Sequence, residues 1–139
     1  MGLGERLEGR ATSDHVVDER HEFVANGLAL EPRSDTRRPY VWRVSARGEL
    51  DAMSSDQLND VVALTIDQGA RAVVLDLTDV VFIDSSGLRS ILKAQADLEA
   101  VGGGLSCVGL SPAAERLLDV TGLLDRLRNG QFERDEPTT

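Results

Sequence analysis

The chain has 139 residues, with 24 Asp or Glu against 15 Lys or Arg, so its formal net charge is −9. This length fits one domain plus a tail, and an apolar content of 41% is enough for one ordinary core. The acidic balance excludes a nucleic-acid surface of clustered Lys and Arg and argues against docking on anionic lipid. It suits a basic or mixed-charge protein partner, although most acidic proteins are simply soluble.

The N-terminal part of the chain, residues 1–26, is charged and has no sustained apolar period. The first residues are followed by charged residues and not by the apolar core of a signal peptide. No apolar run of the chain approaches the ~18 residues of a membrane span. We therefore expect a flexible acidic tail over 1–26 and a cytoplasmic protein without membrane contact. Both histidines, His15 and His21, lie in this tail and are expected to be solvated.

From Gly27 onward the chain shows strand signals at several points. In 40–47 the apolar residues Trp42, Val44 and Ala46 alternate with polar ones, which is typical of a strand with one buried face. The run 72–77 is almost continuously apolar, as in a central strand covered on both faces. Shorter apolar runs predict further strands at 28–30, 80–83 and 105–110, and a last short strand is expected at 126–132.

Three helices are predicted between these strands. Ser54 and Gln57 fit a capping box at the start of the first helix, which Gly69 ends. The second helix spans about 86–100 and carries an apolar stripe.

The third helix opens with Ser111 as its N-cap and Pro112 as its first residue. The order of elements predicts an α/β domain over 27–132, with a mixed sheet of four to five strands packed against three to four helices. Residues 133–139 form a polar end.

The predicted domain lacks the usual signatures of catalysis. It contains no histidine, no Gly-x-Ser-x-Gly elbow and no Gly-Lys-Ser/Thr phosphate loop. Gly102-Gly103-Gly104 follows a helix and precedes a strand, the reverse of a phosphate loop, and therefore predicts a turn. The single cysteine, Cys107, lies in an apolar strand and is expected to be a core residue. We expect no enzyme activity, no metal and no cofactor.

The most informative stretch is Phe82-Ile83-Asp84-Ser85-Ser86-Gly87-Leu88, where an apolar pair leads into a polar helix start. Two interpretations are open. Asp and Ser are good helix caps, and Gly allows a tight turn. Two adjacent hydroxyls at a helix N-terminus also make a site that tolerates a phosphate, because free N–H groups and the helix dipole stabilise negative charge.

Three motifs in this order resemble the STAS domains of bacterial anti-sigma factor antagonists. The central one is Val81-Phe82-Ile83-Asp84-Ser85-Ser86-Gly87-Leu88, which follows Val74-Leu75-Asp76-Leu77. Before it, Gly48-Glu49-Leu50-Asp51 resembles the Gly-Glu-Leu-Asp that ends an early strand in the family. After it, Val120-Thr121-Gly122-Leu123 resembles the usual ending of the third helix. The tail is longer than a minimal member needs, and 129–139 is short and polar for the final helix of many members.

The resemblance implies a function and a site. In the family the unphosphorylated domain binds an anti-sigma factor, often a serine kinase, and so frees the sigma factor. The kinase phosphorylates the first Ser after Asp, which is Ser85 here, and a phosphatase reverses the reaction. The family's partner-binding face corresponds in this chain to six residues: Asp51, Asp84, Ser85, Ser86, Gly87 and Leu88.

Two other functions compete with this one. The chain could be a STAS scaffold in a stress-sensing complex or an accessory domain of a lipid-transport complex, for which the motifs would look similar. It could also be an enzyme with Ser85 or Ser86 as nucleophile, against which the missing histidine argues.

Overall fold

The computed structural model describes residues 16–17 and 22–121. The elements follow in the order β1 (Val16–Val17), β2 (Phe23–Ala25), β3 (Leu28–Ser34), β4 (Val41–Leu50), α2 (Ser55–Asp67), β5 (Ala72–Ile83), α3 (Ser85–Ala100), β6 (Gly104–Val108) and α4 (Pro112–Thr121). The six strands form one sheet in chain order. The pairings from β1 to β4 are antiparallel, and the β4–β5 and β5–β6 pairings are parallel.

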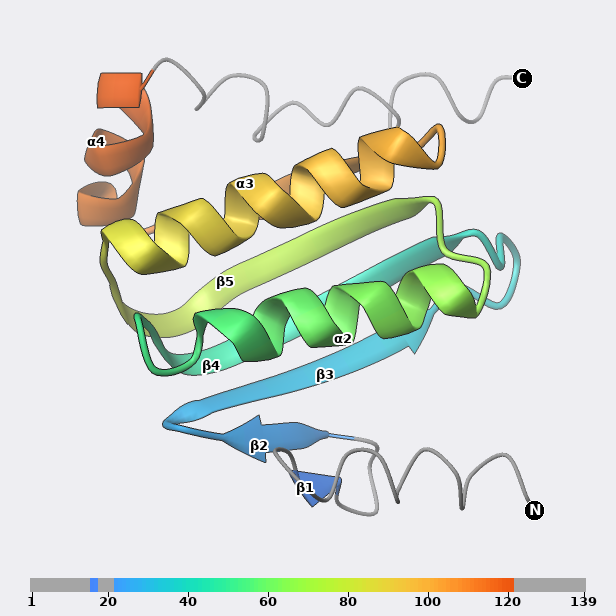
Figure 1. Ribbon diagram of the computed structural model, residues 1–139, viewed down its shortest axis with the longest axis horizontal. Coiled ribbons are helices and arrows are strands. Elements are labelled where there is room, and N and C mark those ends of the chain that lie inside the picture. Colours follow the sequence, from blue (N-terminus) through green and yellow to red (C-terminus); the bar gives the residue numbers. More distant parts are fainter. Residues whose placement is uncertain (1–15, 18–21, 122–139) are drawn as a thin grey trace.

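The predicted α/β class with a mixed sheet is confirmed, and three helices are described. Helices α2 and α3 lie side by side over one face of the sheet, and α4 stands near the end where α3 begins (Figure 1). The core lies between the two helices and the sheet. It includes the buried side chains of Leu30, Val44, Leu75 and Leu105 from the strands and of Leu58, Val62, Ile91 and Leu98 from the helices.

The expected alternation in β4 is present: Val44 and Ala46 are buried, and Arg43 and Arg47 are exposed. Cys107 is buried in β6, as expected, and its burial raises the pKa of the thiol to about 12. Its role as a small core residue is therefore confirmed.

The two apolar runs at 72–77 and 80–83 form one strand, β5, and not two separate elements. Its pairing with β4 contains two irregularities, one between Ser45 and Arg47 and one between Gly48 and Glu49. A bulge places an extra residue in one strand without ending the ladder. The chain can therefore stay in the sheet through Thr78 and Asp79, which break the apolar pattern.

The ordered domain begins before Gly27, which corrects the expected boundary of the tail at residue 26. Strand β2 pairs with β3 through a two-residue turn in which Asn26 and Gly27 have φ of 54° and 81°. Asn-Gly with two positive φ angles is typical of a type I′ hairpin turn. Phe23 is only 8% exposed and belongs to the core. The predictions for 1–15, 18–21 and 122–139, including the strand at 126–132, lie outside the described residues.

Two polar contacts attach this hairpin to the rest of the domain. Gln57 is buried in α2, and its Nε2 donates to the carbonyl oxygens of Phe23 and Leu28 at 3.0 Å each. Glu22 is 7% exposed and accepts a hydrogen bond from the guanidinium of Arg47 on β4. The β2–β3 hairpin is therefore part of the domain.

Replacing Phe23 tests whether the hairpin belongs to the fold. Phe23→Ala should lower the free energy of unfolding by about 3 kcal/mol, because a buried aromatic side chain is lost and a cavity remains. Its neighbour Val24, 38% exposed, supplies the control, and Val24→Ala should change stability by less than about 1 kcal/mol. Urea unfolding followed by circular dichroism measures both. Equal, small effects would place Phe23 outside the core.

Candidate functional site at the start of helix α3

The start of α3 is capped by Asp84. This residue has extended backbone angles, φ −119° and ψ −170°, and its Oδ1 accepts a hydrogen bond from the Gly87 N–H at 3.0 Å. Ser85 is the first helical residue and is exposed, and its hydroxyl makes no hydrogen bond within the described part of the chain. The capping that the sequence left open among Asp84, Ser85 and Ser86 therefore belongs to Asp84.

The second serine of the pair has a different environment. Ser86 is half-buried, and its Oγ accepts a hydrogen bond from Arg89 Nη2 at 3.2 Å. Ser85 is thus the more accessible hydroxyl, and modifying it would break no hydrogen bond that the structure shows. Because the first N–H groups of a helix have no intrahelical partner, they are available to an anion attached there.

The N-terminal turn of α3 rests directly on the end of β4. A Cβ atom on Gly87 would lie 2.3 Å from the Leu50 carbonyl oxygen and 2.9 Å from Cγ1 of Ile83. The same oxygen accepts a hydrogen bond from the Asp84 N–H at 3.3 Å. Only glycine allows this approach without displacing backbone, so Gly87 sets the position of the helix start.

Gly87 and Leu88 were expected on the partner-binding face, and the structure places both in the interior. Gly87 is buried, and Leu88 is 6% exposed and belongs to the core cluster. Their role is therefore to seat the helix. Asp84, Ser85 and Ser86 remain accessible at its start.

Asp51 lies next to this helix start because Leu50 pairs with Ile83. Its Oδ1 accepts hydrogen bonds from the N–H groups of Met53 at 3.0 Å and Ser54 at 3.2 Å. Its carbonyl oxygen also accepts from the N–H groups of Ser54 and Ser55. Asp51 is half-buried and organises the turn before α2, so the structure brings it together with Asp84 and Ser85 at one end of the sheet.

The capping box predicted for Ser54 and Gln57 is wrong. The Ser54 side chain makes no capping bond; its Oγ donates to the Glu49 carbonyl oxygen at 2.8 Å and accepts from the Asp51 N–H at 3.0 Å. The Gln57 side chain turns toward the β2–β3 hairpin. Asp51 accepts from the Ser54 N–H, which the Gln57 side chain would otherwise bond, and the Gln57 N–H donates to the Ser54 carbonyl oxygen. The hairpin carbonyls compete for the Gln57 side chain. By contrast, the cap predicted at Ser111 is confirmed, because its Oγ accepts from the Ala114 N–H at 3.1 Å.

Sequence reasoning missed three exposed apolar side chains at this end of the sheet: Met53, Val81 and Phe82. For Val81 and Phe82 the sequence does contain a signal. The run 80–83 is apolar throughout, whereas a strand with one buried face alternates apolar and polar residues. Among the described residues, no group of three or more His, Cys, Asp or Glu is placed to hold a metal ion. No helix of this part of the chain is long and apolar enough to cross a membrane.

Comparison with known proteins identifies the family. The model of the STAS domain matches residues 35–136. The chain belongs to the STAS domain family. This STAS domain is 34% identical over 83 residues to the anti-sigma-B factor antagonist of Bacillus subtilis, covering 60% of this chain and 75% of that protein. It is 33% identical over 78 residues to the putative anti-sigma factor antagonist BtrV of Bordetella bronchiseptica, covering 56% of this chain and 67% of that protein.

Solved structures agree with this assignment. The structure of the anti-sigma factor antagonist SpoIIAA in its unphosphorylated form matches this STAS domain with a TM-score of 0.61 and 25% identity, over 69% of this chain and 83% of SpoIIAA. SpoIIAA of Bacillus has also been solved in its phosphorylated form, which matches with a TM-score of 0.59. At 24% identity that second match shows the fold alone.

The assignment of the cap to Asp84 can be tested by two neighbouring substitutions. Asp84→Ala should lower the free energy of unfolding by roughly 1 kcal/mol, the usual loss for an N-cap. Ser85→Ala should change stability by less than about 0.5 kcal/mol, because its hydroxyl satisfies no group of the helix. Chemical denaturation of both variants measures this difference. A loss in Ser85→Ala as large as in Asp84→Ala would make Ser85 the cap.

Proposed function

We propose that this STAS domain is an anti-sigma factor antagonist that is switched by phosphorylation of Ser85. Its unphosphorylated form binds an anti-sigma factor in the cytoplasm and so releases the sigma factor. The anti-sigma factor is itself the serine kinase, and a phosphatase restores the active form. The chain acts as a binding module and not as an enzyme, and it needs no cofactor.

One observation carries the proposal: Ser85 is an exposed first residue of α3 whose hydroxyl is not needed to cap the helix. A phosphate on it would gain from the free N–H groups and the positive end of the helix dipole, so the domain would stay folded. The curated relatives support this function over that of a scaffold or transport accessory, since they are anti-sigma factor antagonists.

The charges around Ser85 explain how a phosphate would release the partner. It adds about −1.5 to −2 charge at neutral pH beside Asp84 and Asp51, on a chain of net charge −9. A partner surface that accepts these carboxylates would then have to bury a further, poorly neutralised negative charge. An affinity loss on the order of a hundredfold is expected from such a desolvated charge.

The site of modification is tested by incubation with the cognate anti-sigma factor and ATP, followed by tandem mass spectrometry. We expect one phosphate on Ser85, none on Ser85→Ala, and normal labelling of Ser86→Ala. Phosphate on Ser86 alone, or on a serine elsewhere in the chain, would contradict the assignment.

The effect of the charge is tested by titration calorimetry with the anti-sigma factor. Ser85→Asp should bind about a hundredfold more weakly than the wild type, without loss of helical signal. The matched control is Ser34→Asp, at an exposed serine that pairs with Trp42 at the far end of the sheet, and it should bind normally. Equal affinities for Ser85→Asp and Ser34→Asp would rule out a charge switch at Ser85.

A further inference from the structure

The most exposed large apolar side chains of the described residues gather at one end of the sheet. Val81, Met53 and Phe82 are 79%, 70% and 51% exposed. All three lie within three residues of the paired Leu50 and Ile83, where β4 and β5 end. Monomeric proteins seldom leave apolar side chains clustered in water without a use for them, and such a cluster marks an interaction surface.

A bulge presents Val81 to solvent. On β4, Gly48 and Glu49 are consecutive, whereas their partners on β5, Val80 and Phe82, are separated by one residue. Val81 is the extra residue. Bulges bend a strand and redirect a side chain, which accounts for a valine standing 79% exposed inside a β-strand.

The same segment of β5 also forms one wall of an apolar pocket. Strand β6 pairs with β5 only as far as Asp76, so 77–83 runs past it without a strand on that side in the described part of the chain. The first turn of α4 lies against this edge and closes a pocket of about 170 Å³. It is lined by Leu77, Val80, Val81, Phe82, Ile83, Ser111, Ala113 and Ala114.

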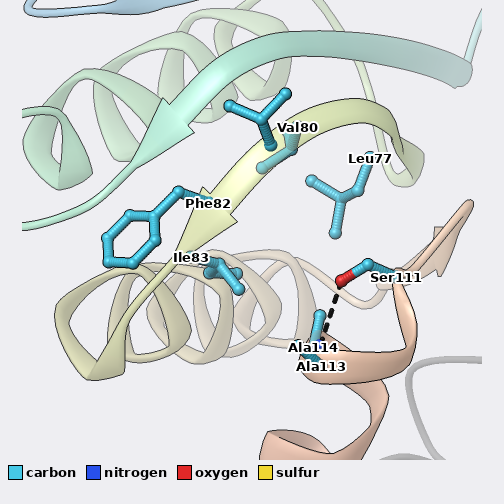
Figure 2. A pocket seen from close by; sticks show the side chains of 8 residues that line it. Leu77, Val80, Phe82, Ile83, Ser111, Ala113 and Ala114 are labelled. Atoms are coloured by element: carbon cyan, nitrogen blue, oxygen red, sulfur yellow. Dashed lines mark hydrogen bonds between the residues drawn. The ribbon is translucent and has the colours of Figure 1, made fainter.

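The pocket has the size and lining for one apolar group. A cavity of roughly 150 Å³ with apolar walls holds a group the size of benzene. Figure 2 shows Leu77 and Ile83 on the side of β5 that faces Ala113 and Ala114, while the ring of Phe82 extends from the other side of the strand. Val81 and Phe82 line the pocket and are also exposed, so the pocket is continuous with the exposed end of β5. We call this surface the β5 tip (77–83 with Ser111, Ala113 and Ala114).

We propose that the β5 tip is a second docking point for the anti-sigma factor, which inserts an apolar side chain flanked by Lys or Arg. The inference rests on the proposed function and adds a surface to it. Phe82 lies three residues before Ser85, so a partner covering the switch serine also reaches the tip. We expect Lys or Arg beside the inserted side chain because this end of the sheet carries four carboxylates. Glu49 and Asp79 are exposed, and Asp51 and Asp84 are half-buried.

A second copy of this chain fits the β5 tip less well. Two copies meeting here would bring these carboxylates together, and like charges facing each other disfavour an interface.

The apolar contact at the β5 tip does not depend on the charge of Ser85. The antagonist therefore has one contact that provides affinity and a neighbouring contact that phosphorylation switches.

The test compares two valines in the same assay, calorimetric titration of the full chain with the cognate anti-sigma factor. Val81→Ser should weaken binding about tenfold, because apolar surface is no longer buried. The matched control Val101→Ser, at an exposed valine just after the end of α3, should bind like the wild type. Ala113→Phe, which fills the pocket, should weaken binding to a similar extent, and added salt should weaken wild-type binding.

The outcomes separate this inference from the proposed function. If the wild type binds and Ser85→Asp does not, while Val81→Ser and Ala113→Phe bind normally, the β5 tip is not a docking point and the switch stands. If the wild type does not bind any anti-sigma factor, both proposals fail. Concentration-dependent dimerisation that Val81→Ser abolishes would identify a second copy as the occupant and overturn the inference. Circular dichroism melts check that each variant is folded.

Discussion

The close approach of Gly87 to the Leu50 carbonyl oxygen is the contact on which the arrangement of the site depends. A side chain at residue 87 would need the space that the end of β4 occupies. With glycine there, the same carbonyl can also accept the Asp84 N–H. Because Asp51 follows Leu50 directly, this one contact brings the turn after β4 and the first turn of α3 together. These two segments are far apart in the sequence.

Asp84, Ser85 and Ser86 take different parts in the hydrogen bonding of the helix start. Asp84 satisfies the Gly87 N–H, and Ser86 is engaged by Arg89. Ser85 is left exposed at the position where the helix dipole tolerates added negative charge best. A modification there can change the surface without removing a hydrogen bond that the fold uses. The proposed phosphorylation of Ser85 requires this arrangement, because the domain must stay folded with and without the phosphate.

Near both edges of the sheet, contacts that the local sequence does not indicate join the strands to helices. Near the β1 edge the buried amide of Gln57 donates to the carbonyl oxygens of Phe23 and Leu28, which ties α2 to the β2–β3 hairpin 29 to 34 residues earlier in the chain. At the other, β5 outruns β6 and meets α4, which leaves the pocket of the β5 tip. The irregular pairing of β4 with β5 lets the long strand continue past Thr78 and Asp79 as far as Ile83, two residues before Ser85.

The sequence by itself determined the class of fold, the extent of most elements, the family and the position of Ser85 at the start of a helix. These follow from local patterns: the period of apolar residues, the caps and glycines at element ends, and a motif read in order. The sequence also contains the Asn26-Gly27 signal for the hairpin, although the charge of the segment before it is typical of a tail. Tertiary structure alone decided which polar group caps α3, where Gln57 points, and that Gly87 is buried. Each of these depends on competition among partners brought together by the sheet, and a linear pattern carries no information on which acceptor or surface a side chain will meet.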